Sequence, residues 1–151
     1  MKLTDVLPLE NTLLDVPGGS KKRVLENRSH FLAERITDLD SDELYQGLLA
    51  RERLGSTGIG EGIAIPHCRI AGCKKITGAL LNLADPVDFD SMDNVLVDLV
   101  FALIVPEEQN DEHLQVLSSI AELLQEEDVR IQLRAASSIE AFYKIAISRE
   151  G

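Results

Sequence analysis

The spacing of apolar positions along the chain predicts strands and helices in alternation. Short or continuous apolar runs predict strands at 12–16, 63–65, 78–84 and 95–105. Apolar positions that recur every three or four residues predict helices at 21–39, 41–53, 128–136 and 139–147, and a further helix after Asn110. Strands interleaved with helices predict an α/β fold, with one central mixed sheet and helices on both of its faces.

Polar residues at the boundaries support these elements. Ser20 follows the turn 17–19 and is placed to cap the first helix, and Asp40 or Ser41 can cap the second. Asn110 can cap the helix that follows Pro106. The run 95–105 is almost continuously apolar, which is typical of a strand covered on both faces.

The segment 55–62 interrupts the pattern because it is too rich in glycine for a helix. Its sequence is Gly-Ser-Thr-Gly-Ile-Gly-Glu-Gly, and it leads into the apolar triplet 63–65. It therefore predicts a loop that feeds a short buried strand, and its lightly shielded backbone amides can surround an anion such as phosphate. The Lys and Ser/Thr of a Walker A motif are missing, and the glycine spacing does not fit a dinucleotide-binding loop.

Pro66 and His67 follow the buried strand directly. Pro66 has no N–H to donate and biases Ile65 toward an extended conformation, so the strand is predicted to stop there. His67 would then lie beyond the carboxyl end of the strand, where open α/β sheets bind ligands. Taken alone, a histidine in this place is more simply a partly buried side chain with a hydrogen bond at a strand end.

Length and composition favour an ordinary folded domain. The chain has 151 residues, which fits a single domain over 1–151, with 44% hydrophobic and 27% charged residues. Asp5, Pro8 and Glu10 stand where a secretion signal would need a continuous apolar segment. The longest apolar stretch, 95–105, is far shorter than the ~20 residues of a spanning helix. We therefore expect a cytoplasmic protein without membrane insertion.

The balance of charges argues against nucleic acid as a partner. The formal net charge is -11, and affinity for DNA or RNA comes largely from Lys and Arg side chains that neutralise phosphates. The same charge disfavours anionic membrane surfaces. The short basic run 21–23 is more simply the solvated first turn of a helix.

Cys68 and Cys73 lie close to His67 and raise the possibility of a metal site. Zinc takes four protein ligands, or three and a water, and no further Cys or His cluster lies nearby in the sequence. We expect two reduced, structural thiols. Neither a metal nor a cofactor is predicted.

The segment 55–60, Gly-Ser-Thr-Gly-Ile-Gly, followed by Ile-Ala-Ile-Pro-His at 63–67, resembles the phosphorylation-site signature of the fructose/mannitol-type IIA domains of the phosphotransferase system. Within that family the chain is most similar to the nitrogen-regulatory branch. The resemblance covers nearly the whole chain, including Pro-Val-Asp-Phe-Asp at 86–90 and Val-Asp-Leu-Val-Phe-Ala-Leu at 97–103.

The resemblance implies roles for three residues. His67 would be the phosphoacceptor, forming a tele-phosphohistidine intermediate; Arg51 would lie beside it, and His113 would be the second active-site histidine. All three residue types are present at matching positions. The chain departs from the family at Cys68, where a glycine usually follows Pro-His.

The chemistry of the side chains supports these roles independently of the family resemblance. A neutral imidazole is a competent nucleophile near pH 7, and phosphoryl transfer needs cations or amide dipoles around the transferring group. The planar donors of Arg51 suit that charge, although Arg53 and Arg69 compete with it on sequence alone.

His113 can be interpreted as a structural residue as well as an active-site histidine. His113 falls in the first turn of the helix after Asn110, where a helix N-terminus disfavours imidazolium, and it could equally be a capping or core-edge side chain. His30, beside Phe31 within the first long helix, is expected to be structural.

Three functions from different classes remain open at this point. The first is a regulatory phosphocarrier of the nitrogen branch, which takes phosphate from an HPr-like phosphocarrier and acts on regulated proteins such as kinases or transporters. The second is a sugar-transport IIA component that passes phosphate to a separate IIB for fructose or mannitol. The third is a non-catalytic binding module that recognises partners through its acidic surface.

Overall fold

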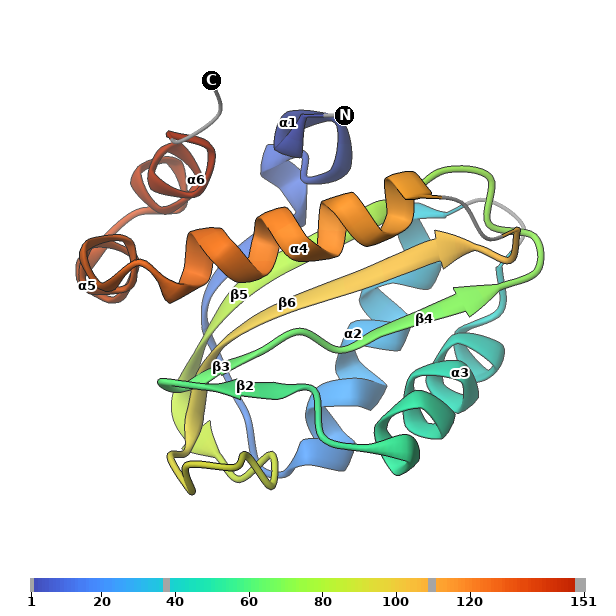
Figure 1. Cartoon of the computed structure of the whole chain (residues 1–151), viewed down its shortest axis with the longest axis horizontal. Helices are drawn as coiled ribbons and strands as arrows, with labels where there is room; N and C mark the ends of the chain where they lie inside the picture. Colours follow the sequence, from blue (N-terminus) through green and yellow to red (C-terminus); the bar gives the residue numbers. More distant parts are fainter. Residues whose placement is uncertain (1, 37–38, 109–110, 149–151) are drawn as a thin grey trace.

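The computed structural model describes residues 2–36, 39–108 and 111–148 of the chain. Its elements follow in the order α1 (Leu3–Val6), the short 3-10 helix η1 (Leu9–Asn11), β1 (Thr12–Val16), α2 (Lys21–Arg35), α3 (Ser41–Leu54), β2 (Gly58–Gly60), β3 (Ile63–Ala64), β4 (His67–Ile70), β5 (Thr77–Val87), β6 (Val97–Pro106), α4 (Asp111–Gln125), α5 (Glu127–Ala135) and α6 (Ile139–Ile147). Figure 1 shows α4 along one face of the sheet and α2 and α3 against the other. The predicted α/β fold is confirmed.

The sheet is mixed, as expected. Its strands lie in the order β1-β5-β6-β3-β2, and β4 also pairs with β6. The pairs β1–β5, β3–β6 and β4–β6 are parallel, while β5–β6 and β2–β3 are antiparallel. β6 is therefore the central strand, and every other part of the sheet is placed relative to it.

β6 is buried on both faces, which explains its continuous apolar sequence. Leu99, Phe101 and Leu103 belong to the core cluster that includes Val116, Ile120 and Leu124 of α4. Ala102 and Ile104, on the alternate face, belong to the cluster of α2 and α3 side chains. Successive side chains of a strand point to opposite faces, so a strand between two helical layers needs apolar residues at every position.

The strand stops before Pro66, as predicted, but the prediction that His67 lies beyond the end of the strand, outside the sheet, was wrong. β3 stops at Ala64, but the chain resumes pairing with the same neighbour as β4, so that Ala64 lies opposite Val100 and His67 opposite Leu103. The register is kept across the break because Pro66 can still accept: its carbonyl receives the Leu103 N–H at 2.9 Å. Because Pro66 has no N–H to donate, it separates β3 from β4, while pairing with β6 continues on both sides of it. His67 therefore opens a new strand segment inside the sheet.

The helix boundaries follow the predicted caps. Ser20 accepts the Arg23 N–H at its side-chain oxygen, and Asp40 accepts that of Glu43, both at 3.2 Å. α2 ends at Arg35 and not at Leu39 as expected. The predicted cap Asn110 lies outside the described residues.

The sequence pattern predicted the two-residue strand β3 but missed other short elements, β4 among them. α1, η1 and β2 have four, three and three residues, too few to show a hydrophobic period. β2 falls within the glycine-rich segment predicted as a loop, and its strand character comes from pairing with β3. In the part of the chain that the structure describes, no helix has the length and apolar character needed to cross a membrane.

Candidate functional site

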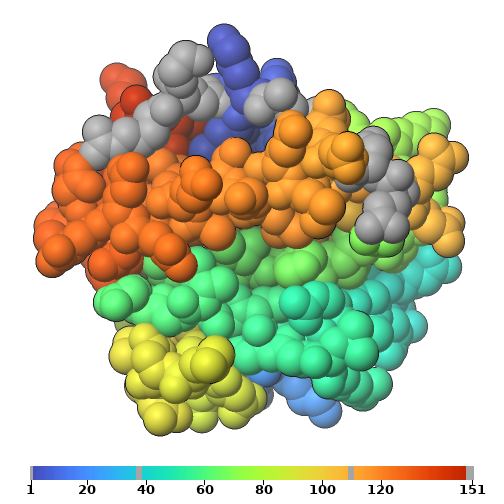
Figure 2. Space-filling model, viewed as in Figure 1, coloured from blue at the N-terminus to red at the C-terminus, as the bar shows by residue number. Residues whose placement is uncertain are grey.

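A cleft of about 610 Å³ lies where α3, β4 and α4 meet. Figure 2 shows these segments adjoining one another on one face of the molecule, with α4 in orange above the green and cyan-green segments of residues 41–70. The side chains of Arg51, His67 and His113 all line the cleft. The structure thus brings together the three residues singled out in the sequence, from three separate elements.

The ring of His67 is held by its own neighbourhood in the chain. Its Nδ1 lies 2.7 Å from the carbonyl oxygen of Ile65. A carbonyl oxygen can only accept a hydrogen bond, so Nδ1 carries the hydrogen and donates it. The neutral ring then has its lone pair on Nε2, because the partner of one ring nitrogen fixes the state of the other.

The surroundings of His67 also keep the ring neutral. Burial lowers the pKa of His67 below its usual 6.5, because a buried imidazolium loses hydration. The Ile65 carbonyl partly opposes this effect, and the charge of Arg51 adds to the lowering of the pKa. At pH 7 the side chain is therefore an uncharged imidazole with a free nitrogen.

Arg51 stands in the last turn of α3, half-buried at the cleft. Its Nη1 donates to the carbonyl oxygen of Gly55 at 2.9 Å, which ties the helix end to the start of the glycine-rich segment. Arg53, one competitor from the sequence, is exposed and does not line the cleft, whereas Arg69 lines it from an exposed position. Of the three arginines, Arg51 is the least exposed to solvent.

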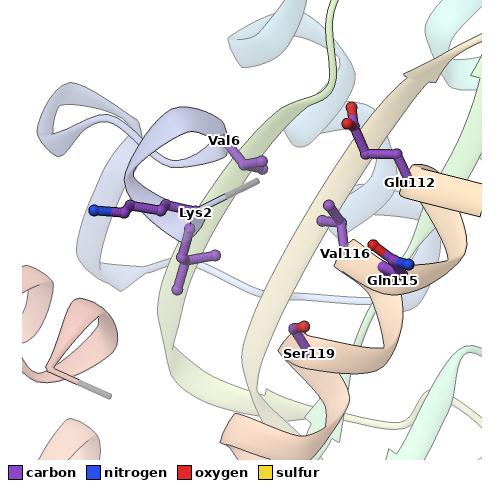
Figure 3. A pocket seen from close by; sticks show the side chains of 7 residues that line it. Lys2, Val6, Glu112, Gln115, Val116 and Ser119 are labelled. Atoms are coloured by element: carbon purple, nitrogen blue, oxygen red, sulfur yellow. The ribbon is translucent and has the colours of Figure 1, made fainter. Parts of the chain in front are cut away.

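His113 lies in the first turn of α4 and is only 6% exposed. Its neighbour Glu112 lines a small cavity of about 90 Å³ between α1 and α4 (Figure 3). Lys2, Leu3 and Val6 of the N-terminal segment line that cavity. The N-terminal segment therefore supports the end of α4 that carries His113. His30, by contrast, is exposed on α2 and lies outside the cleft lining.

Cys68 points away from the His67 ring, into the layer between the sheet and α3. It is 7% exposed and belongs to the core cluster of Leu44, Leu48 and Ile104. A methyl group on Gly47 would lie 3.1 Å from its Sγ, so the glycine of α3 makes room for the thiol. The replacement of the family's usual glycine is thus accommodated by packing against α3, at the wall of the cleft that His67 also lines.

The thiols have the character of core side chains. Burial, with a smaller contribution from Cys73, raises the pKa of Cys68 to about 12, and burial raises that of Cys73 as well. Both cysteines are free. Among the residues that the structure describes, no group of three or more His, Cys, Asp or Glu side chains is arranged to hold a metal ion.

Sequence reasoning missed Glu52, which lies beside the cleft and is 7% exposed. Its carboxylate accepts hydrogen bonds from the backbone N–H and the hydroxyl of Thr57, at 3.0 and 2.6 Å. The spacing of Leu44, Leu48 and Glu52 held a signal, because residues four apart share one face of a helix. An acid that continues an apolar stripe is a candidate for a buried, paired carboxylate.

The sequence of the chain matches a known family over almost its whole length. The family model described as "Phosphoenolpyruvate-dependent sugar phosphotransferase system, EIIA 2" matches residues 5–148. The chain belongs to this family. Its fold, with a mixed sheet between helical layers, is therefore that of an EIIA 2 domain.

Relatives within the EIIA 2 family carry names from nitrogen regulation. The nitrogen regulatory protein of Pseudomonas aeruginosa is 48% identical over 147 residues, 97% of this chain and 96% of that protein. Its namesake from Escherichia coli K12 is 41% identical, with 100% of this chain and 93% of that protein covered. The crystal structure of IIA-Ntr from Neisseria meningitidis matches with a TM-score of 0.90 and 42% identity, over 95% of this chain and 98% of that one. The predicted resemblance is confirmed.

Proposed function

We propose that this protein is a histidine phosphocarrier of a nitrogen-regulatory phosphotransferase system, with His67 as its phosphoacceptor. The observation that carries the proposal is the 2.7 Å contact between His67 Nδ1 and the Ile65 carbonyl, which leaves the lone pair on Nε2 of a neutral ring. That nitrogen is the nucleophile that phosphoryl transfer requires. The product is a tele-phosphohistidine, phosphorylated at Nε2.

In the transfer step, the Nε2 lone pair of His67 attacks the phosphorus of a phosphohistidine on the donor. The new N–P bond forms as the donor's N–P bond breaks, and its electron pair leaves with the donor imidazole. The His67 ring gains positive character during attack, and the hydrogen bond from Nδ1 to Ile65 stabilises it. Arg51 and His113, which line the same cleft, are placed to stabilise the phosphoryl oxygens.

The donor in this proposal is an HPr-like phosphocarrier of the nitrogen branch, and the targets are regulated proteins such as kinases or transporters. The names of the relatives support the nitrogen branch. The protein would act in the cytoplasm through its phosphorylation state. The modification adds up to about two negative charges to a protein of net charge -11, which strengthens repulsion from acidic partners.

The direct test is phosphorylation from phosphoenolpyruvate through purified general components of either the nitrogen or the sugar branch. We expect acid-labile phosphate on Nε2 of His67, supplied faster by the nitrogen branch. His67→Ala should accept none, while the matched variant His30→Ala should behave as wild type. Supply by the sugar branch alone, with onward transfer to a IIB protein, would favour the sugar-transport function. A protein that takes phosphate from neither branch would be a binding module.

A further inference from the structure

Glu52 is a charged residue buried beside the cleft, and the mechanism above gives it no role. One carboxylate oxygen accepts from the Thr57 N–H at 3.0 Å and from Lys21 Nζ at 2.8 Å. The other accepts from the Thr57 hydroxyl at 2.6 Å. A buried carboxylate is tolerated only when such partners replace its lost hydration. Thr57 and Lys21 thus stabilise the negative charge of the buried Glu52 carboxylate.

The partners of Glu52 fix one residue of the glycine-rich segment. Both donors of Thr57, its N–H and its hydroxyl, are engaged by the same carboxylate, so Thr57 is held in position and in orientation. The flanking residues include Gly55 and Gly58, whose backbones are otherwise free to adopt many conformations. Glu52 is therefore the anchor of Thr57, beside the hydrogen bonds that Arg51 makes to Gly55 and Ser56 makes to Phe89.

Two further hydrogen bonds connect Thr57 to the reactive ring. The carbonyl of Thr57 accepts the Ile65 N–H at 2.9 Å, and the carbonyl of Ile65 accepts from Nδ1 of His67 at 2.7 Å. Ile65 lies in the break between β3 and β4, outside the paired residues of both strands. Ile65 thus links the two side chains through the peptide groups on either side of its Cα: its N–H is bound by Thr57, and its carbonyl orients His67.

We propose that Glu52 is a positioning residue, which holds the His67 ring in its Nδ1–H form through Thr57 and the Ile65 peptide. This inference rests on the proposed phosphoacceptor role of His67. Glu52 touches neither the ring nor the phosphoryl group. Its negative charge raises the pKa of His67 directly, whereas its effect on the tautomer acts through the chain of hydrogen bonds. Lys21, which also donates to the carbonyl of Phe89 at 3.3 Å, joins the anchor to α2 and to the segment before β6.

The experiment measures the tautomer of the His67 ring and the rate of phosphorylation on the same variants. Glu52→Ala removes the anchor, and Thr57→Val removes only the hydroxyl while keeping the shape of the side chain. Glu52→Gln and Thr57→Ser are the conservative variants, because each can still bridge the two positions. Glu26→Ala, at an exposed glutamate of α2, is the matched control. Circular dichroism and thermal melting establish which variants are folded.

We expect ¹⁵N chemical shifts of the His67 ring to report Nδ1–H in the wild type and in the control. In Glu52→Ala, and to a smaller extent in Thr57→Val, a second tautomer with hydrogen on Nε2 should appear. The rate of phosphorylation should fall about ten- to a hundredfold in Glu52→Ala, as misplacement of a reacting group typically causes. Glu52→Gln and Thr57→Ser should recover most of the rate and the original tautomer.

A wild-type tautomer in folded Glu52→Ala would overturn the inference, whatever the rate. Should that variant not fold, a wild-type tautomer in Thr57→Val decides the question in the same way. The proposed function can fail separately: wild-type protein that takes no phosphate on His67 is not the phosphocarrier, although the ring shifts still show whether Glu52 sets the tautomer. Slow transfer with unchanged shifts would retain the phosphocarrier and reject the positioning role.

Discussion

The chemical state of His67 is set by its neighbours. The Ile65 carbonyl determines which ring nitrogen carries hydrogen, and burial together with Arg51 lowers the pKa. Burial and Arg51 favour a neutral ring at pH 7, and the Ile65 carbonyl leaves the lone pair of that ring on Nε2. In the proposed transfer, His67 would therefore need no separate base to remove a proton from it.

At the residue scale, the first prediction concerns Arg51. Arg51→Ala should raise the pKa of His67, because one of the causes that lower it is the positive charge of Arg51. An NMR titration of the His67 ring in both proteins measures this directly. The acid limb of the phosphorylation rate should move to higher pH by the same amount. An unchanged or lower pKa in the variant would show that the two side chains are not electrostatically coupled.

The lowered pKa of His67 also has a consequence for folding. The unfolded chain, with an ordinary pKa near 6.5, binds the proton more tightly than the folded state does. As the pH falls from about 6.5 toward the lowered pKa, the wild type should therefore lose stability. Denaturation with urea over this range, compared with His67→Gln, isolates the contribution. A loss of the same size in both proteins would assign it to other groups.

The second histidine gives a prediction about rate. Since His113 is buried, His113→Gln is a better test than a truncation, because it keeps volume and a polar end. We expect phosphorylation of His67 to slow by about 10²–10³, the usual effect of losing one group that stabilises the transition state. Unfolding free energy should change far less. A rate within twofold of wild type would remove His113 from the proposed site.

At the scale of elements, the site depends on an interrupted strand. β3 and β4 keep one register against β6, yet the break between them turns the Ile65 N–H to Thr57 and its carbonyl to His67. α3 contributes two adjacent residues of opposite charge: Arg51 lines the cleft, and Glu52 binds Thr57. Through Glu52 and Thr57, α3 is thus connected by hydrogen bonds to Ile65, in the break between β3 and β4.

The packing of β4 on α3 predicts inert thiols. Burial raises the pKa of Cys68 to about 12 and also raises that of Cys73, while reactivity requires the thiolate. In folded protein at pH 8, both cysteines should react with a disulfide reagent far more slowly than free cysteine. In guanidinium chloride both should react at once. Rapid reaction of one thiol in the native state would place that side chain at the surface.

On the scale of the whole molecule, the sheet is a rigid support with the site at its edge. The side chains of β6 are buried between two helical layers, so a charge added at His67 meets a core that resists rearrangement. Phosphorylation should therefore act on partners through local charge and not through refolding.

Hydrogen exchange on the unmodified and phosphorylated forms tests this prediction. Protection should change around the segment 55–62, His67 and the start of α4, and remain the same in β5 and β6. Partner affinity should differ between the two forms, with a difference that shrinks as salt rises because the added charges are exposed to screening. Exchange changes spread across the sheet would indicate a conformational switch instead.

The sequence by itself determined the main elements of this protein and its candidate site residues. Periodic apolar residues located β1 and α6 with the observed bounds, and the unbroken run of β6 indicated a strand covered on both faces. Sequence patterns suffice to locate these elements, because the hydrophobic period and the capping residues depend only on residues close by in the chain. The resemblance named Arg51, His67 and His113, and the structure places them in one cleft.

Only the tertiary structure decided how those residues are held. The sequence predicted that β3 stops before Pro66 but not that His67 starts β4, because that strand forms by pairing with β6, which is distant in sequence. The inward direction of Cys68 depends on the space beside Gly47, and the role of Glu52 depends on Thr57 and Lys21 coming to the same carboxylate. Pairing and burial join residues distant in sequence, so the tautomer of His67 is a property of the fold.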